Sequence, residues 1–273
     1  MVVVDRMVVK DSDTSDIDTS NQHQPLSDYR ENVAWILLGE PGAGKSTSLM
    51  QEANSSSENT EFLSIAEFLF DFSDDELKGK TLFLDGLDEI RASTNDGTVL
   101  LKVKNKLRRL GSPKFRIACR AADWLGSSDS DDLKSVSQNN EITRLLISPL
   151  SNHNIESILK ENYNIVEPNN FIRKAERFGV YHLLENPQTL EMLVKAVSGD
   201  RWPESRIDTF QLACEKLVDE NNKRHRDLNR FSTKNKQALL DAAGQLFSVM
   251  MLAGKDGIAL DQSASTTRFP YLN

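Results

Sequence analysis

Short apolar runs alternate with longer helical patterns through the first half of the chain. The runs are almost entirely apolar, which is typical of strands covered on both faces of a sheet. They span residues 33–38, 62–65, 81–84, 115–119 and 142–147. The segments between them, at 48–54, 66–78, 98–110 and 121–136, are long enough for crossover helices or loops. This alternation predicts an α/β fold with a five-stranded, mainly parallel sheet that carries helices on both faces.

After Pro149 the strand pattern ends and helical periodicity takes over. Ser151 and Asn186 stand where helix caps are expected, and Pro187 takes the first-turn position that proline favours. Apolar residues recur at helical spacing in 168–178, 208–221 and 234–253. The second half therefore predicts an all-helical module that follows the sheet.

The two patterns divide the chain into four parts. Residues 11–28 are polar, acidic and without period, so we expect a flexible leader over 1–28. The sheet domain is predicted at 29–150, the helical domain at 151–230 and a final segment at 231–273. The chain closes on RFPYLN without a polar cap, so we expect this end to be a boundary within a longer protein.

Composition and charge exclude several classes of protein. The 273 residues can bury a sizeable core, and a net charge of −8 argues against an extended nucleic-acid surface, which needs clustered Lys and Arg. No run approaches the ~18 apolar residues that a membrane span requires. The two cysteines suit a reducing compartment, and the four histidines lack metal-ligand spacing. We expect a cytoplasmic protein without a zinc site and without a membrane partner, and the negative net charge argues against nucleic acid as a partner of this segment.

A glycine-rich stretch, GEPGAGKST, carries the strongest chemical signal. It fits the pattern G-x-x-x-x-G-K-[ST] at Gly39, Gly44, Lys45 and Ser46. Small residues let the backbone curl so that its N–H groups converge on phosphate oxygens, and the following helix aims its positive end at the same anion. Lys45 is then placed for the β and γ phosphates of a nucleotide, and the Ser46 hydroxyl for Mg²⁺. The residues expected to bind nucleotide are Gly39, Glu40, Pro41, Gly42, Ala43, Gly44, Lys45, Ser46 and Thr47.

Three acids follow the apolar run at 81–84. Asp85 comes directly after the run, and we expect it to hold Mg²⁺ together with Ser46, partly through water. Asp88 and Glu89, about one turn further, are candidates to polarise the attacking water. An acidic pair is often only a solvated turn, but three acids after a buried strand are costly unless a cation or water network uses them.

Two further residues complete the candidate site. Arg120 ends the run at 115–119, and the carboxyl ends of parallel strands face the ligand crevice, so its guanidinium can reach the γ-phosphate. A surface ion pair is the alternative for Arg120. Pro187 begins a helix that a two-domain arrangement would lay across the nucleotide base, although a first-turn proline explains it equally well. Trp124 is expected to be a packing anchor rather than a stacking partner for the base.

Four stretches together resemble the NACHT branch of the STAND NTPases, signal-transduction relatives of AAA+ ATPases that include the animal NLR immune receptors. They are GEPGAGKSTSL, LFLDGLDE, FRIACRAADW, and LLENPQTLEML followed by RWPESRIDTFQLACEKLV. The DGLDE form is the most specific, because AAA+ machines usually place Glu directly after the Walker B Asp, where this chain has Gly86. PKFRIACRAADWLG is further similar to bacterial NACHT proteins, including Avs-type antiphage sensors. The resemblance spans roughly 30–270.

The resemblance implies a role for each motif. Walker A lies at 39–47, and Walker B at Asp85 with Asp88 and Glu89. Arg120 is the sensor-1 arginine, and Pro187 is the helical-domain proline on the base side of ADP or ATP. Residues 151–230 form the first helical domain, and 231–273 begin a winged helix that looks truncated and lacks the histidine with which many STAND proteins hold ADP.

The function implied by the resemblance is a nucleotide-controlled switch with weak ATPase activity, acting in bacterial antiphage defence. ADP would hold a closed monomer, and ATP with Mg²⁺ would favour self-association through domains beyond this chain. The trigger is unidentified, a phage protein being one candidate. Three alternatives stay open: an AAA+-like remodelling motor, a small-molecule P-loop kinase, and a non-hydrolysing scaffold that holds ADP.

Overall fold

A computed structural model of the chain describes residues 3–11, 23–56, 59–94, 98–197 and 236–254, together with 202, 208, 211 and 215. The chain divides into two compact units. One holds Met1–Arg177 and Tyr181–Leu190, and the other holds Phe178–Val180 and Glu191–Asn273. The domain boundaries predicted at residues 150 and 230 stay a prediction.

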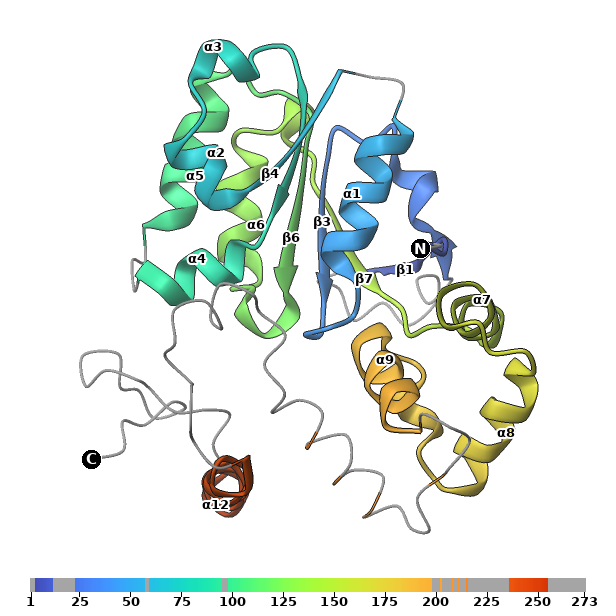
Figure 1. The fold of residues 1–273 in the computed structure, drawn as a ribbon. Helices are drawn as coiled ribbons and strands as arrows, with labels where there is room; N and C mark the ends of the chain where they lie inside the picture. Colours follow the sequence, from blue (N-terminus) through green and yellow to red (C-terminus); the bar gives the residue numbers. More distant parts are fainter. Residues whose placement is uncertain are drawn as a thin grey trace. The chain divides into compact units, whose positions relative to one another are not determined.

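A seven-stranded mixed sheet forms the centre of the first unit (Figure 1). Its spatial order is β2-β1-β7-β3-β6-β5-β4. The strands are β1 (Met7–Lys10), β2 (Gln24–Pro25), β3 (Ala34–Gly39), β4 (Thr60–Ser64), β5 (Thr81–Asp85), β6 (Phe115–Arg120) and β7 (Thr143–Ile147). Strands β3 to β7 pair in parallel, whereas β1 runs antiparallel to both β7 and β2. The α/β class is therefore confirmed.

The predicted number of strands is wrong. Each of the five apolar runs forms a strand, but β1 and β2 extend the sheet from five strands to seven. The predicted flexible leader is also wrong for the described part of 1–28, because β1, β2 and the 3₁₀ helix η1 (Leu26–Tyr29) lie there. Residues 12–22, which carry most of the acidic stretch, lie outside the described residues. An antiparallel edge strand depends on a partner far along the chain, which no local pattern reveals.

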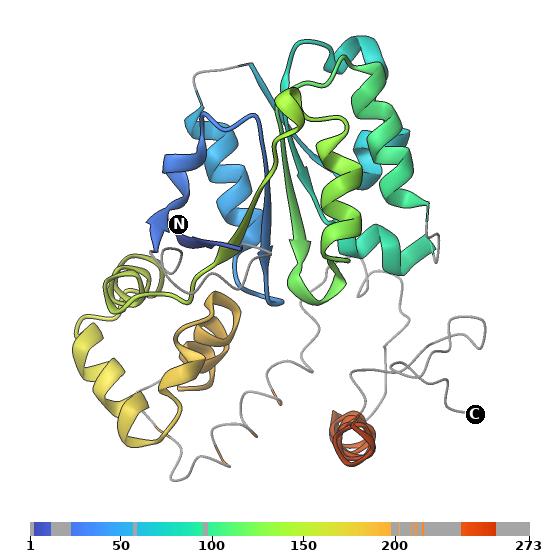
Figure 2. The same cartoon turned by 180° about the vertical axis from the view of Figure 1, so that it is seen from behind.

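Two apolar cores lie against the two faces of the sheet. The helices of this part are α1 (Lys45–Ser55), α2 (Ile65–Phe70), α3 (Asp74–Leu77), α4 (Leu87–Thr94), α5 (Val99–Arg109) and α6 (Ser127–Lys134). Alternate residues of β3 point to opposite faces: Trp35 and Leu37 belong to the core that includes α1 and η1, whereas Ile36 and Leu38 belong to the core with α2 to α6. Helices therefore cover both faces, as predicted, with α1 and α5 on opposite sides of the strands (Figures 1 and 2).

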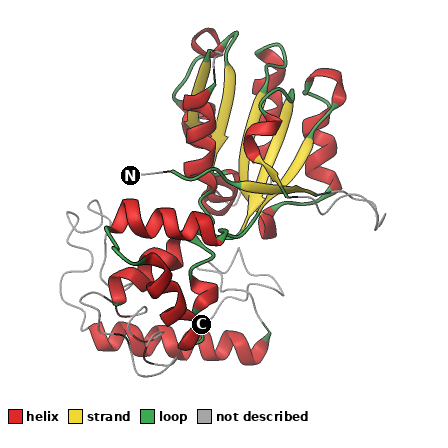
Figure 3. Ribbon diagram, turned by 90° about the vertical axis from the view of Figure 1, so that its right-hand side faces the viewer, coloured by secondary structure: helices red, strands yellow, loops and turns green. Residues whose placement is uncertain are grey.

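The helices after β7 begin at the capping residues that the sequence indicated. The Ser151 side chain accepts a hydrogen bond from the Asn154 N–H at the start of α7 (Asn152–Tyr163). Asn186 Oδ1 accepts from the Gln188 N–H, 3.0 Å away, at the start of α9 (Pro187–Ala196). The first unit also contains α8 (Pro168–Arg177) and the short 3₁₀ helices η2 (Ala121–Asp123), η3 (Gln138–Asn140) and η4 (Tyr181–Leu183). Figure 3 shows these elements by type, with strands in yellow and helices in red.

The last described helix, α12 (Lys236–Ala253), confirms the helix predicted over 234–253. Most of the helix predicted over 208–221 lies outside the described residues, as does the remainder of the winged helix expected at 231–273. In the part of the chain that the structure describes, no helix is both long enough and apolar enough to cross a membrane.

Candidate nucleotide-binding site

The glycine-rich loop joins β3 to α1 at the carboxyl end of a central strand. Its conformation requires glycine at two positions, since Gly42 and Gly44 have φ angles of +73° and +86°. Gly44 immediately precedes α1, so the loop turns directly into a helix N-terminus. This is the strand–loop–helix context that the sequence pattern needs.

Lys45 extends back over the loop that precedes it. Its Nζ donates to the carbonyl oxygens of Gly39 and Glu40, each 2.9 Å away. Burial lowers the pKa of Lys45, and the nearby carboxylates of Asp88 and Asp85 act in the opposite direction. The ammonium group therefore contacts the backbone carbonyls at the start of the loop and lies near two acidic side chains.

Ser46 and Asp85 meet although they belong to different motifs. Asp85 ends β5, and its carboxylate accepts hydrogen bonds from the Ser46 side chain and from the Gly86 N–H. Burial raises the pKa of Asp85 and outweighs these two bonds. A hydroxyl and a carboxylate are hard oxygen ligands of the kind that Mg²⁺ prefers. The structure therefore brings together the two side chains that the sequence indicated for one metal.

The described residues contain no group of three or more His, Cys, Asp or Glu side chains that could hold a metal ion. Mg²⁺ in nucleotide sites usually takes only one or two protein ligands, and water and substrate phosphates fill the remaining positions. The pair formed by Ser46 and Asp85 is sufficient for that kind of site.

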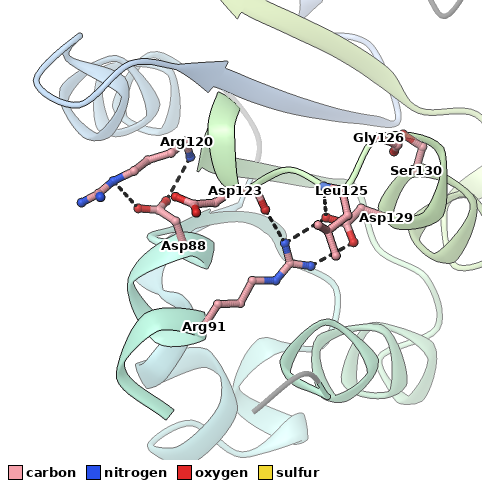
Figure 4. A network of polar contacts seen from close by, with 8 residues as sticks. All are labelled: Asp88, Arg91, Arg120, Asp123, Leu125, Gly126, Asp129 and Ser130. Atoms are coloured by element: carbon pink, nitrogen blue, oxygen red, sulfur yellow. Dashed lines mark hydrogen bonds and ion pairs between the residues drawn. The ribbon is translucent and has the colours of Figure 1, made fainter. Parts of the chain in front are cut away.

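Asp88 and Arg120 form an ion pair at the end of β6 (Figure 4). Asp88 lies in the first turn of α4 and is 7% exposed. Its Oδ1 accepts from the Arg120 backbone N–H at 3.1 Å, and its Oδ2 lies 2.8 Å from Arg120 Nε. Arg120 is the register partner of Gly39 on β3, so the ion pair stands beside the start of the loop. Glu89 is exposed, and its carboxylate lies over Gly86.

A second ion pair, not found from the sequence, fixes the helix that carries Asp88. Arg91 of α4 donates to both carboxylate oxygens of Asp129, each 2.9 Å away, and to the Asp123 carbonyl oxygen at 2.8 Å. Asp129 also accepts from the Leu125 N–H at 3.0 Å (Figure 4). The sequence around 127–140 resembles a surface connection, which concealed the buried acid in α6. Trp124, which lies just before this segment, is buried in the core, as predicted.

The start of α9 contacts the crest of the glycine-rich loop, by which we mean residues 41–44. Asn186 Nδ2 donates to the Pro41 carbonyl oxygen at 3.0 Å, and the Gln188 N–H donates to the Gly42 carbonyl oxygen at 3.4 Å. Pro187 lies against Gly44, since a Cβ at that glycine would be 3.4 Å from Pro187 Cγ. These contacts lie within the first unit. The sequence indicated Asn186 and Pro187 as a helix start but gave no sign that Asn186 and Gln188 contact the loop. Contact of Pro187 with a base stays a prediction.

Comparison with known proteins leaves the family open. No family model matches the chain, and no match is found among curated proteins. The fold and the loop geometry are those of an α/β protein and are compatible with the P-loop class. The NACHT resemblance of its motifs stays a prediction.

Proposed function

We propose that the chain binds ATP and ADP with Mg²⁺ through the loop at 39–47 and acts as a nucleotide-controlled switch with weak ATPase activity. The observation that carries the proposal is the meeting of Ser46 and Asp85 beside Lys45. Three side chains that phosphate and Mg²⁺ require come from two motifs and meet at the carboxyl ends of β3 and β5.

The residues present fit such a ligand. Gly42 and Gly44 give the loop the curled backbone that turns N–H groups towards an anion, and α1 adds the positive end of its dipole. Bound Mg²⁺ would supply a Lewis acid that stabilises negative charge on the phosphates. Ser46 would be its direct ligand, and Asp85 would orient its water shell. Lys45 would exchange the carbonyls of Gly39 and Glu40 for phosphate oxygens.

The ion pair between Asp88 and Arg120 supports slow turnover. A carboxylate that polarises water needs a free oxygen lone pair facing that water. Both Asp88 oxygens already accept a contact from Arg120, which takes up one lone pair on each, so opening of the pair would free a further lone pair for the water. Arg120 is half exposed and can exchange Asp88 for a γ-phosphate, which would make this arginine the group that distinguishes ATP from ADP.

The wider proposal follows the motif resemblance. The switch would be cytoplasmic, a location that suits the buried free thiol of Cys119. A difference of ~1–3 kcal/mol in nucleotide affinity between two states is enough for such coupling. Self-association in the ATP state, a trigger such as a phage protein and a role in antiphage defence depend on domains beyond this chain.

The test of nucleotide binding is calorimetric titration of wild type and Lys45→Ala with ADP and with ATP and Mg²⁺. Loss of a charged hydrogen-bond donor should weaken binding about 10- to 100-fold. Lys80→Ala is the matched control, because Lys80 pairs with Glu61 at the opposite ends of the strands. Equal affinities for wild type and Lys45→Ala would contradict binding at this loop.

A non-hydrolysing scaffold that holds ADP is the second candidate, and the same ion pair favours it because the candidate base is already engaged. Single-turnover measurement with ATP separates the two functions. Hydrolysis in wild type that is lost in Asp88→Asn supports the ATPase. Tight binding without hydrolysis in either protein supports the scaffold.

A further inference from the structure

Arg6 reaches the phosphate loop from the edge of the sheet. It immediately precedes β1, and its side chain is buried, with 6% of the residue exposed. Nη1 donates to the Ala43 carbonyl oxygen at 2.6 Å, and Nη2 donates to the Ser148 carbonyl oxygen at 2.5 Å. One guanidinium therefore joins the loop to the residue that follows β7.

The bond to Ala43 matches a need of the loop itself. A loop whose N–H groups converge on an anion must turn some of its carbonyls away from that anion. A carbonyl that is turned into the protein needs a donor, because an unpaired buried carbonyl costs free energy. Ala43 is buried, and Arg6 supplies the donor to its carbonyl oxygen from outside the loop.

Burial of the positive charge of Arg6 is unfavourable in free energy. Burial lowers the pKa of Arg6 to about 10, so the guanidinium is still a cation near neutral pH. Within the described residues its hydrogen bonds go to neutral carbonyls, and no ion pair compensates the charge. A buried cation of this kind is unfavourable unless an anion lies nearby. Arg6 Nη1 would lie 3.1 Å from a Cβ placed on Gly44, the last loop residue before α1.

The backbone around Arg6 is fixed on both sides. The Arg6 carbonyl oxygen accepts from the Leu26 N–H, and the Met7 carbonyl oxygen accepts from the Ser148 N–H, each at 2.9 Å. Asp5 Oδ1 also accepts from Gln51 of α1 at 3.1 Å. The guanidinium is therefore presented to the loop by strand pairing that exists without any ligand, which is what preorganisation requires.

We propose that Arg6 is a positioning residue of the phosphate loop: by capping the Ala43 carbonyl and tying it to the Ser148 carbonyl, it holds the loop in its anion-accepting conformation. The residue that precedes β1, the second strand from the edge of the sheet, thereby becomes part of the site. The proposal deepens the proposed function and rests on it for the identity of the anion, a nucleotide phosphate. The effect on the loop itself does not depend on that identity.

The test compares Arg6→Gln and Arg6→Lys with the matched control Arg144→Gln in the full chain. Arg144 is also a buried arginine that ties β7 to the chain near β1, since it donates to the Asp11 carbonyl oxygen. The contacts described for Arg144 are with Asp11 and not with the loop at 39–47. Amide hydrogen exchange at residues 42–46 reports on the loop without nucleotide, and ADP titration reports on binding. Thermal unfolding measures any general loss of stability.

We expect Arg6→Gln to raise exchange at residues 42–46 and to weaken ADP binding about tenfold, the scale of a lost charge-assisted hydrogen bond. Arg6→Lys keeps the charge but loses the second carbonyl contact, so we expect intermediate changes in loop exchange and in ADP affinity. This variant provides the test if Arg6→Gln does not fold. Arg144→Gln should destabilise the chain without either change. Equal loop exchange in Arg6→Gln, Arg6→Lys and Arg144→Gln would overturn the positioning role. If wild type binds no nucleotide while Arg6→Gln alone loosens the loop, the positioning role stands and the proposed function fails.

Discussion

Asp88 accepts two contacts from one residue, Arg120: the backbone N–H at 3.1 Å and Nε at 2.8 Å. The acid sits at the start of α4, and the arginine ends β6. The first contact uses the main chain and is independent of the side-chain rotamer, whereas the second is lost when the guanidinium moves. A γ-phosphate that attracted Arg120 would therefore release one oxygen of Asp88 while leaving its helix in place.

Arg120→Ala should reduce the preference for ATP over ADP. The guanidinium contributes to binding only when a γ-phosphate is present, so ATP affinity should fall about tenfold while ADP affinity changes little. Titration with both nucleotides measures the ratio. Arg109→Ala removes an exposed ion pair with Asp74 and serves as the control. An equal loss of affinity for ATP and for ADP would show that Arg120 does not distinguish the two nucleotides.

Asp88→Asn should retain nucleotide binding and slow hydrolysis. The amide cannot act as a base, and loss of a positioned general base typically costs about 100-fold or more in rate. Phosphate release under saturating ATP provides the measurement, with Asp74→Asn as the control. If Asp88→Asn hydrolyses ATP at the wild-type rate, another group polarises the water, and Glu89 becomes the next candidate.

Asp85→Asn should have opposite effects on stability and on metal binding. Burial raises the pKa of Asp85, so the folded protein favours the neutral carboxyl and loses stability as pH rises from the ordinary aspartate range through the raised pKa. Asparagine removes that penalty, so the variant should unfold at a higher temperature near neutral pH. It should also lose the gain in ATP affinity that Mg²⁺ gives wild type.

Calorimetry and thermal unfolding with and without Mg²⁺ check both effects of Asp85→Asn. In wild type, the gain in ATP affinity that Mg²⁺ provides should decrease as pH falls. Because the pKa of Asp85 is raised, this decrease should begin at a higher pH than it would with an aspartate of ordinary pKa. A variant that is less stable than wild type, or that keeps the full Mg²⁺ effect, would contradict this role of Asp85.

The ion pair between Arg91 and Asp129 should stabilise the fold. Removing one partner leaves the other charge buried, and Asp129 is almost fully enclosed, so Arg91→Ala should lower the free energy of unfolding by about 3 kcal/mol. The double variant Arg91→Met with Asp129→Leu should be less affected than Arg91→Ala. Denaturant unfolding of both variants measures the difference. A double variant that is destabilised as much as Arg91→Ala, or more, would contradict this role of the pair.

Parts of this molecule could be predicted because they depend on local sequence. Strands β3, β5 and β6 are mostly buried and appear as apolar runs, β4 and β7 are apolar in part, and the loop at 39–47 has fixed spacing. The meeting of Ser46 and Asp85 followed from a general rule, that the carboxyl ends of parallel strands lie together.

Other parts depend on contacts between distant segments. Strand β1 is defined by its register with β7, and nothing in the local sequence shows that Arg6, which precedes it, contacts the loop. Likewise, Asn186 and Gln188 appeared as residues of a helix start, and nothing local placed them on the crest of the loop. Side-chain pairing between Asp88 and Arg120 also required the packed sheet, because each residue separately fits several roles.

The most direct test of the central claim is the nucleotide content of the purified protein. Wild type and Lys45→Ala are denatured, the released small molecules are identified by chromatography, and the emptied or refolded protein is titrated with ADP and with ATP and Mg²⁺. We expect wild type to release ADP or to bind the added nucleotides, and Lys45→Ala to retain less nucleotide and to bind it about 10- to 100-fold more weakly. A wild-type protein that releases no nucleotide and binds none would contradict the central claim.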